Sequence, residues 1–174
     1  MAHITSPTAP QPDALNRFRE LVSKFRTAMF VTQGREPGLH ARPMAVAKME
    51  ENGTFWFVTG RDTPKMDELT AHPEALVCLQ KDNQFVTVAG RVEVVQDRSK
   101  VEELWSESFR VWFEGKDDPN LVLLRLVPNA GEYWDQSGTR GLKYAFRAAK
   151  AYATKERMDP RADEPETHGA VKLP

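Results

Sequence analysis

Apolar residues recur at a helical spacing near the start of the chain and at strand spacing through its middle. From Asp13 onward they fall three or four residues apart, at Leu15, Phe18, Leu21, Val22 and Phe25. This spacing predicts an amphipathic helix, with Asp13 placed to cap its first turn. Short apolar or alternating stretches follow, separated by turn residues, as in a sheet. Strands are expected at 28–32, 39–49, 55–59, 75–79, 85–95 and 121–127, the last continuing through 132–134.

Turn residues and short helices separate these strands. Asn52-Gly53 predicts a two-residue hairpin turn, because both residue types tolerate positive φ. Helices are expected at 62–72, where a proline follows, and at 98–105, while 107–120 is irregular. About six strands with few helices between them favour a mainly β fold, an antiparallel β-barrel with flanking helices, over a parallel sheet.

The 174 residues suit one domain with polar ends. Residues 1–12 are proline-rich with little to bury, which predicts a flexible leader. The barrel domain is expected over 13–138. Residues 139–158 have a helix-forming composition with a basic face and are expected to form a C-terminal helix packed on the barrel, and 159–174 a polar tail.

Composition narrows the functional classes. Lys and Arg number 24 against 25 Asp and Glu, a balance that argues against a general nucleic-acid binder. One cysteine allows neither an intramolecular disulfide nor a cysteine metal cluster. No apolar run approaches the ~18–20 residues that span a bilayer, and the N-terminus lacks the pattern of a signal peptide. A cytoplasmic protein without a membrane partner is therefore expected.

Motifs of hydrolases and nucleotide-binding loops are absent. The chain has no G-x-S-x-G, H-E-x-x-H or G-x-x-x-x-G-K-[ST] sequence. Its four histidines are scattered, so no metal site is expected. Cys78 lies within an apolar run, which favours a buried, inert thiol over a nucleophile.

Two basic residues near strand ends have the composition of a phosphate site. Arg42 precedes a proline within a strand, which indicates an edge or a bulge, and Lys65 follows Thr63-Pro64 at a predicted helix start. An arginine fork, a lysine charge, hydroxyls and helix amides together bind phosphate groups. By composition alone, Arg42 and Lys65 are more often ordinary surface charges.

Tryptophans at element ends add a second signal. Trp105, Trp112 and Trp134 lie at element ends or in irregular sequence, where they could wall a flat aromatic ligand. Plain packing or a subunit contact is the alternative interpretation.

The order and spacing of these segments resemble a known family. The first set is Ala41-Arg42-Pro43-Met44, Phe55 to Gly60, Lys65 and Val86 to Glu93. These segments resemble the pyridoxamine 5'-phosphate oxidase-like flavin-binding split barrels. The later segments, Val101 to Trp105, Trp112-Phe113, Gly115 to Asn120 and Glu132 to Asp135, are similar to the general stress protein 26 branch of that superfamily.

The resemblance implies a six-stranded antiparallel split barrel and a homodimer that binds FMN at the subunit interface. It implies a phosphate contact from Arg42 and Lys65, and a strand under the flavin at Pro43 and Met44. It further places Val58 and Thr59 at the isoalloxazine edge and brings Trp134 from the partner subunit. Phe57, Thr63 and Trp112 complete the expected cofactor-binding set.

Two departures separate the chain from a true pyridoxamine phosphate oxidase. That enzyme's arginine–leucine–histidine substrate motif corresponds here to Arg140-Gly141-Leu142-Lys143-Tyr144, which lacks the histidine and the second arginine. Its flavin-contacting glutamine falls at Phe85, with Gln84 beside it. The expected function is therefore an FMN-binding, stress-related protein, a flavin-dependent oxidoreductase of unknown substrate that exchanges electrons with a small molecule.

Three alternatives stay open, and no catalytic residue is assigned. The first is a flavin-binding sensor or carrier without turnover. The second is a reductase that uses the deazaflavin F420 in place of FMN. The third, a genuine pyridoxamine phosphate oxidase, is disfavoured by the missing substrate motif.

Overall fold

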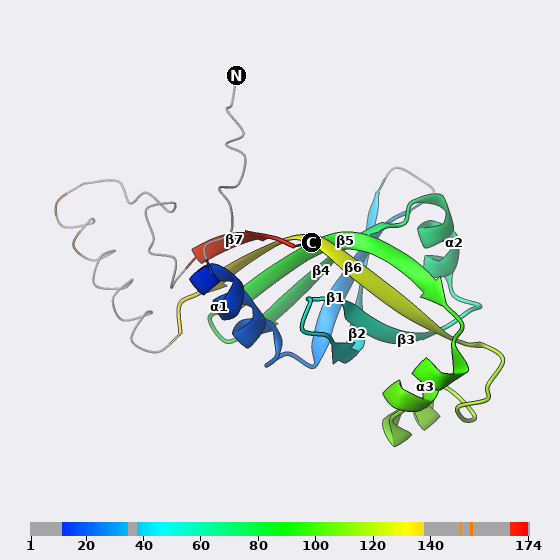
Figure 1. The fold of residues 1–174 in the computed structure, drawn as a ribbon. Helices are drawn as coiled ribbons and strands as arrows, with labels where there is room; N and C mark the ends of the chain where they lie inside the picture. Colours follow the sequence, from blue (N-terminus) through cyan, green and yellow to red (C-terminus); the bar gives the residue numbers. More distant parts are fainter. Residues whose placement is uncertain (1–11, 35–37, 138–149, 151–153, 155–167, 174) are drawn as a thin grey trace.

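The computed structural model describes residues 12–34, 38–137, 150, 154 and 168–173. Its strands are β1 (Thr27–Gln33), β2 (Leu39–Met49), β3 (Phe55–Gly60), β4 (Glu74–Lys81), β5 (Gln84–Val95), β6 (Leu121–Asp135) and β7 (His168–Lys172). The sheet order is β3-β2-β1-β4-β5-β6-β7, with all neighbouring pairs antiparallel, and β3 also pairs with β6. The first six strands therefore close into the predicted mainly β barrel, and β7 extends the sheet beside β6 (Figure 1).

Helices cover the two ends of the barrel. The helix α1 (Pro12–Val22) contacts β5, β6 and β7 at one end (Figure 1). At the other end lie α2 (Pro64–Ala71), α3 (Arg98–Leu104) and a 3₁₀ helix, Glu107–Val111. No described helix combines the length and apolar character needed to cross a membrane.

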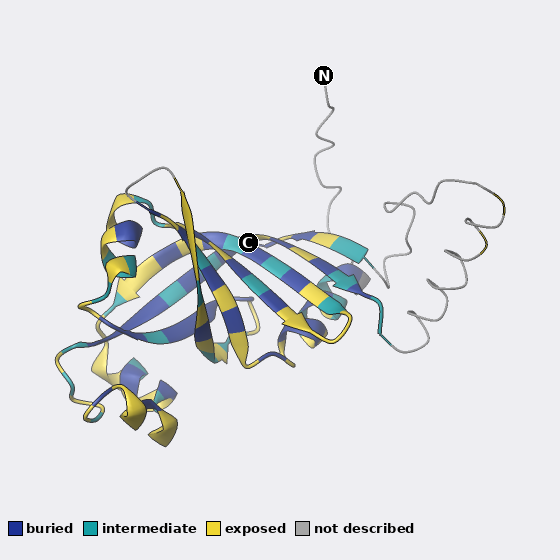
Figure 2. Ribbon diagram, turned by 180° about the vertical axis from the view of Figure 1, so that it is seen from behind, coloured by how far each residue is buried: buried dark blue, intermediate teal, exposed yellow. Residues whose placement is uncertain are grey.

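Alternation along the strands builds the main core inside the barrel (Figure 2). In β1, Ala28, Phe30 and Thr32 are buried, while their neighbours are exposed or partly exposed. The Phe30 ring packs edge-on against Phe57 of β3, with ring centroids 5.1 Å apart. This period of two is the signature of a sheet with one face buried.

A second, smaller core ties residues 107–113, the 3₁₀ helix with the two residues that follow it (the 3₁₀ segment), to the barrel. Its buried members come from β3, α3, the 3₁₀ segment and the start of β6: Trp56, Val101, Leu104, Phe109, Phe113, Leu121 and Leu123. This cluster fixes residues 107–113 against the strand end where Gly60 lies, and so positions one wall of the pocket described below.

Most predicted strands are confirmed, and β6 is longer than expected. It runs unbroken from Leu121 through Pro128 to Asp135. The pairing between β5 and β6 shifts register between Ala89 and Gly90, where Gly90 faces Pro128. Proline has no N–H to donate to the neighbouring strand. The bulge lets β6 continue through Pro128 without that hydrogen bond.

Two local predictions are wrong. The β2–β3 connection is a loop over residues 50–54 and not a two-residue turn, since Glu50 N donates to Thr54 O and Gly53 N to Glu50 O. The Asn52 side chain accepts from Thr54 N, 3.0 Å away, and Gly53 has φ 87°. Asp13 lies inside α1 and not at its N-cap, because the helix begins at Pro12, a residue suited to a first helical position.

The expected polar tail is also corrected at its end. Residues 168–172 form β7, and Val171 and Leu173 are buried in the main core. Positions 150 and 154 are helical. The rest of the predicted C-terminal helix (139–158), residues 159–167 and residues 1–11 of the predicted leader lie outside the described residues.

Candidate functional site

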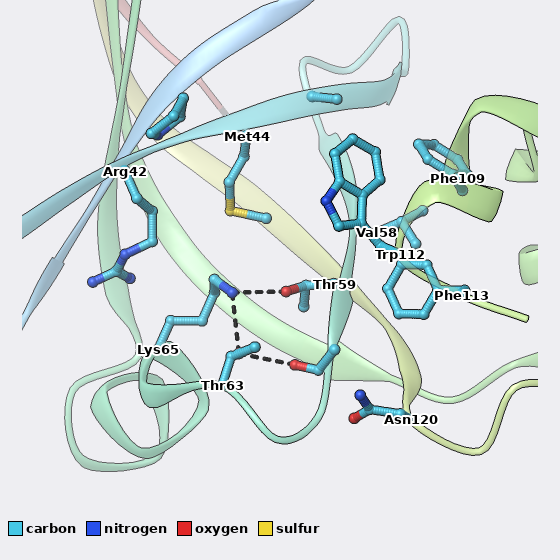
Figure 3. Close-up of a pocket in the computed structure, with 13 residues that line it drawn as sticks. Arg42, Met44, Val58, Thr59, Thr63, Lys65, Phe109, Trp112, Phe113 and Asn120 are labelled. Atoms are coloured by element: carbon cyan, nitrogen blue, oxygen red, sulfur yellow. Dashed lines mark hydrogen bonds between the residues drawn. The ribbon is translucent and has the colours of Figure 1, made fainter.

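A pocket of about 490 Å³ opens between β2, β3, the start of α2 and the 3₁₀ segment. Figure 3 shows basic side chains at one end and aromatic side chains at the other. The pocket is lined by Arg42, Pro43, Met44, Ala45, Val58, Thr59, Gly60, Thr63, Lys65, Phe109, Trp112, Phe113 and Asn120. Its size falls within the range of small-molecule sites.

A gap in the pairing of β2 exposes Arg42, Pro43 and Met44 to this pocket. Residues 39–45 of β2 pair with β1, whereas pairing with β3 begins at Val46 and shifts register before Lys48. Pro43 lies in the stretch without β3 pairing, where its missing N–H costs no hydrogen bond. The edge or bulge predicted from the sequence is confirmed.

The connection from β3 to α2 forms the floor of the basic end. Thr63 Oγ1 donates to Gly60 O at 2.8 Å, and α2 starts with Pro64. Asn120 holds the loop from the opposite side, because its backbone oxygen accepts from Arg61 N at 2.7 Å. Its side-chain oxygen also accepts from the Asp62 amide at 3.0 Å. The loop is therefore fixed before any ligand binds.

Lys65 projects from the first turn of α2 into the pocket. Its Nζ donates to Thr59 Oγ1 at 2.8 Å and to Thr63 Oγ1 at 3.0 Å (Figure 3). Burial lowers the pKa of this ammonium group and the nearby Arg42 charge lowers it further, while the Glu68 carboxylate opposes the shift only in part. Among the described residues no carboxylate forms an ion pair with Lys65. An anion beside Nζ would stabilise the charged form of Lys65 and raise its pKa again.

Arg42 completes the basic end and is hydrogen-bonded to two residues that do not line the pocket. Its Nη2 donates to Glu68 Oε2 at 2.7 Å and its Nη1 to Thr32 Oγ1 at 2.9 Å. These bonds use two of the five N–H donors of a guanidinium group. The other donors remain able to bind a ligand in the pocket.

Aromatic residues form the opposite end. Phe109 and Phe113 are buried, whereas Trp112 is 68% exposed. Trp105 packs edge-on against Phe109, with centroids 6.0 Å apart, which anchors the segment. Together with Met44 and Val58, these side chains offer an apolar surface suited to a flat ring system.

Two of the residues predicted for the site do not line the pocket. Phe57 is fully buried in the main core, because its ring points into the barrel against Phe30. Trp134 pairs with Phe85 and stacks on His168 with centroids 5.1 Å apart. It lies at the end of the barrel covered by α1, since the next residue, Asp135, forms an ion pair with Arg17 of that helix. A contact of Trp134 with a partner's site stays a prediction. The other eight predicted residues line one pocket.

Other residues in question lie elsewhere. The Gln84 amide donates to Asp135 at 3.2 Å and to Ser137 at 3.1 Å, and Gln84 does not line the pocket. The 140–144 segment lies outside the described residues. Cys78 is partly exposed and not buried as predicted, and burial raises the pKa of its thiol, which disfavours the nucleophilic thiolate. In the described part of the chain no cluster of metal-ligating side chains occurs.

Five residues that line the pocket were not predicted from the sequence: Ala45, Gly60, Phe109, Phe113 and Asn120. Phe109, Trp112 and Phe113 recur at i, i+3 and i+4, the spacing of one helical face, and this was the available signal. Asn120 gives no such signal, because its role depends on contact with an amide 58 residues away along the chain.

Comparison with known proteins agrees with this geometry. A family model described as pyridoxamine 5'-phosphate oxidase like matches residues 13–159. The chain belongs to the pyridoxamine 5'-phosphate oxidase-like family. General stress protein 26 of Bacillus subtilis (strain 168) is 33% identical over 90 residues, which are 45% of this chain and 64% of that protein.

Solved structures of this family have the same fold. A structure assigned as a general stress protein 26 from Jannaschia sp. CCS1 has a TM-score of 0.69 at 26% identity, and the match covers 94% of this chain and 100% of that one. The general stress FMN/FAD binding protein of Xanthomonas citri has a TM-score of 0.64 at 28% identity, with 74% and 92% covered.

Proposed function

We propose that this protein binds FMN in the pocket between β2, β3 and the 3₁₀ segment. One observation carries the proposal: Arg42 and Lys65 lie at one end of the pocket and an aromatic surface lies at the other. Among the described residues that line it, there is no carboxylate to oppose an anion. A phosphate ester joined to a flat aromatic ring matches both ends.

FMN fits the basic end better than FAD does. Its terminal phosphate carries close to two negative charges, which suits an arginine fork together with a lysine charge. The relative from Xanthomonas citri is named as an FMN/FAD binding protein, so both flavins are candidates on the comparison. The choice of FMN rests on the two cations that converge at one end of the pocket.

We further propose that the protein is a flavin-dependent oxidoreductase of unknown substrate. The described pocket lining has no carboxylate, imidazole or thiol to act as an acid or base. A bound flavin would supply the redox chemistry, and the protein would orient it and bind its phosphate.

A homodimer is the third part of the proposal. Met29, Val31, Leu76 and Cys78 face outward from the paired strands β1 and β4 and leave an uncharged, largely apolar surface, with Met29 41% and Leu76 36% exposed. Pro43 pairs with Met29 and also lines the pocket, so this surface reaches the pocket edge. A second copy seated there would shield the apolar face and close the open side of the pocket.

Ligand titration tests the FMN site. Arg42→Ala and Lys65→Ala should each weaken FMN binding by about 1.5–3 kcal/mol, the size of a hydrogen bond to a charged group. Riboflavin, which lacks the phosphate, should bind all variants alike. Arg91→Ala is the control, because Arg91 is an exposed residue outside the pocket that pairs with Glu74. Unchanged FMN affinity in both pocket variants would refute the site.

Spectroscopy of the purified protein separates the oxidoreductase from a carrier and from an F420 protein. A yellow protein that is bleached by anaerobic NADH or NADPH supports turnover. A yellow protein that neither donor bleaches favours a sensor or carrier, and tighter binding of F420 than of FMN favours the deazaflavin.

Light scattering tests the dimer. The wild-type protein should have twice the mass of the 19.7 kDa chain. Leu76→Glu, which puts a charge on the apolar surface, should give a monomer with weaker FMN binding, whereas Glu93→Gln on the exposed side of β5 should leave the dimer intact. A wild-type monomer with full FMN affinity contradicts this part of the proposal.

A further inference from the structure

A buried carboxylate lies behind the basic end of the pocket. Glu68 on α2 is 5% exposed and does not line the pocket. Burial alone would raise the pKa of Glu68, but hydrogen bonds from Thr32, His40 and Arg42 lower it to about 2. The group is therefore a fixed negative charge at neutral pH, beside a pocket whose own charges are positive.

The contacts of Glu68 tie three elements of the fold together. Its Oε2 accepts from Thr32 Oγ1 of β1 at 2.5 Å and from Arg42 Nη2 of β2 at 2.7 Å. Its Oε1 lies 2.6 Å from His40 Nδ1, which must carry the hydrogen because an ionised carboxylate can only accept. Thr32 also accepts from Arg42 Nη1, so Arg42, Thr32 and Glu68 form a closed triangle.

This triangle fixes the plane of the Arg42 guanidinium. The group is rigid and planar, and partners at both Nη atoms define its orientation. Thr32 is 1% exposed, so the triangle rests on a buried anchor. A side chain that is already ordered loses less rotamer entropy when a ligand binds.

We propose that Glu68 is a positioning residue for a phosphate-bearing ligand: it holds Arg42 so that the guanidinium's remaining N–H donors face the pocket. This inference rests on the proposed FMN site. It assigns a role in anion binding to a residue that itself carries a negative charge and does not touch the ligand.

Electrostatics alone predicts the opposite effect of removing this charge. The Glu68 carboxylate repels a phosphate, so replacing it with a neutral amide would tighten FMN binding if charge alone mattered. If orientation of Arg42 dominates, the same substitution weakens FMN binding. The sign of the change therefore separates positioning from simple charge balance.

The test compares FMN and riboflavin binding in matched variants. Glu68→Gln should raise the Kd for FMN roughly tenfold, the effect of impairing one charged hydrogen bond, and change the Kd for riboflavin less than about twofold. Thr32→Val removes the hydroxyl that forms two of the three sides of the triangle, leaves the net charge unchanged and should weaken FMN binding in the same sense. Asp67→Asn, on the exposed side of the same helix, removes an equal charge and should leave both affinities unchanged.

A double variant asks whether Glu68 acts through Arg42. In the Arg42→Ala background, Glu68→Gln should cause no further loss of FMN affinity, because there is no guanidinium left to position. Thermal unfolding of each variant shows that it is folded before titration. If Glu68→Gln does not fold, Thr32→Val and its combination with Arg42→Ala carry the test.

The outcomes separate this inference from the FMN site itself. Tighter or unchanged FMN binding in Glu68→Gln overturns the positioning role, and so does an equal loss for riboflavin. A further loss in the double variant overturns it too. A wild-type protein that binds FMN no better than riboflavin would instead contradict the proposed phosphate site.

Discussion

Asp135 gives a quantitative prediction about how α1 is held on the barrel. Its side chain at the end of β6 is fully buried and forms an ion pair with Arg17 of α1. The carboxylate also accepts from Ser137 Oγ at 2.6 Å and from the Gln84 amide. Burial alone would raise the pKa of Asp135, but these hydrogen bonds lower it from 3.8 to about 2.

The size of the effect follows from this pKa. A carboxyl group whose pKa falls from 3.8 to about 2 on folding contributes about 2 kcal/mol of stability at neutral pH. Asp135→Asn removes the charge, presents an amide to Arg17 and leaves that guanidinium without its buried partner. The free energy of unfolding should therefore fall by about 2–4 kcal/mol, the upper part being the cost of leaving the largely buried Arg17 with only the more exposed Glu20 as its partner.

The pH dependence has a definite sign. The folded-state pKa lies below the unfolded value, so the stabilisation is complete above pH 3.8 and is lost as the pH falls through about 2. Urea unfolding followed by tryptophan fluorescence should show the gap between wild type and Asp135→Asn narrowing by about 1 kcal/mol between neutral pH and about pH 3. The comparison isolates this one group, because the two proteins share every other carboxylate.

Two results would refute this reasoning. One is a gap that stays constant from neutral pH to about pH 3, and the other is a gap below about 0.5 kcal/mol at neutral pH, the size expected of an exposed ion pair. A double variant supplies the control. Arg17→Gln combined with Asp135→Asn should cost less than the sum of the single changes, because each single change already breaks the same pair.

Two further predictions concern the bulge and the aromatic wall. Gly90→Ala should destabilise the fold by about 1–3 kcal/mol in urea unfolding, because its Cβ would lie 2.4 Å from the backbone oxygen of Val127, whereas Gly115→Ala meets nothing within 4 Å and should change stability little. Trp112→Ala should leave the melting temperature nearly unchanged, since this side chain is 68% exposed, yet weaken FMN and riboflavin binding several-fold in the same titration. Equal stability of the two glycine variants, or unchanged flavin affinity without Trp112, would contradict them.

The barrel could be predicted from the sequence because its signals are local. In β3 and β5, apolar and polar residues alternate or cluster over the same ranges that become strands. The strand β7 gives a weaker signal, since a five-residue segment holds few apolar positions. Val171 becomes buried where β7 pairs with β6 and contacts α1, partners that the local pattern does not identify. A short terminal strand of this kind depends on tertiary context.

The site residues likewise differ in whether a local sequence signal reveals them. Arg42 and Lys65 could be predicted because each lies beside a proline, at a strand irregularity or a helix start, and the family resemblance pointed to the same positions. Phe57 lies outside the pocket although its neighbour Val58 lines it, because a one-residue step along a strand turns a side chain to the other face. Glu68 could not be predicted, because its partners on β1 and β2 are distant in sequence.

The two ends of the pocket depend on different parts of the fold. The basic end is built on β1, β2 and α2, whose buried residues belong to the main core, whereas Phe109 and Phe113 belong to the second core with α3. A ligand that spans both ends therefore bridges two packing units. A ligand stabilises the state to which it binds. Added FMN should therefore slow amide hydrogen exchange more in the 3₁₀ segment than in the barrel strands, which the main core already holds closed. This division predicts that substitutions at the basic end and at the aromatic end affect the binding of FMN and riboflavin differently.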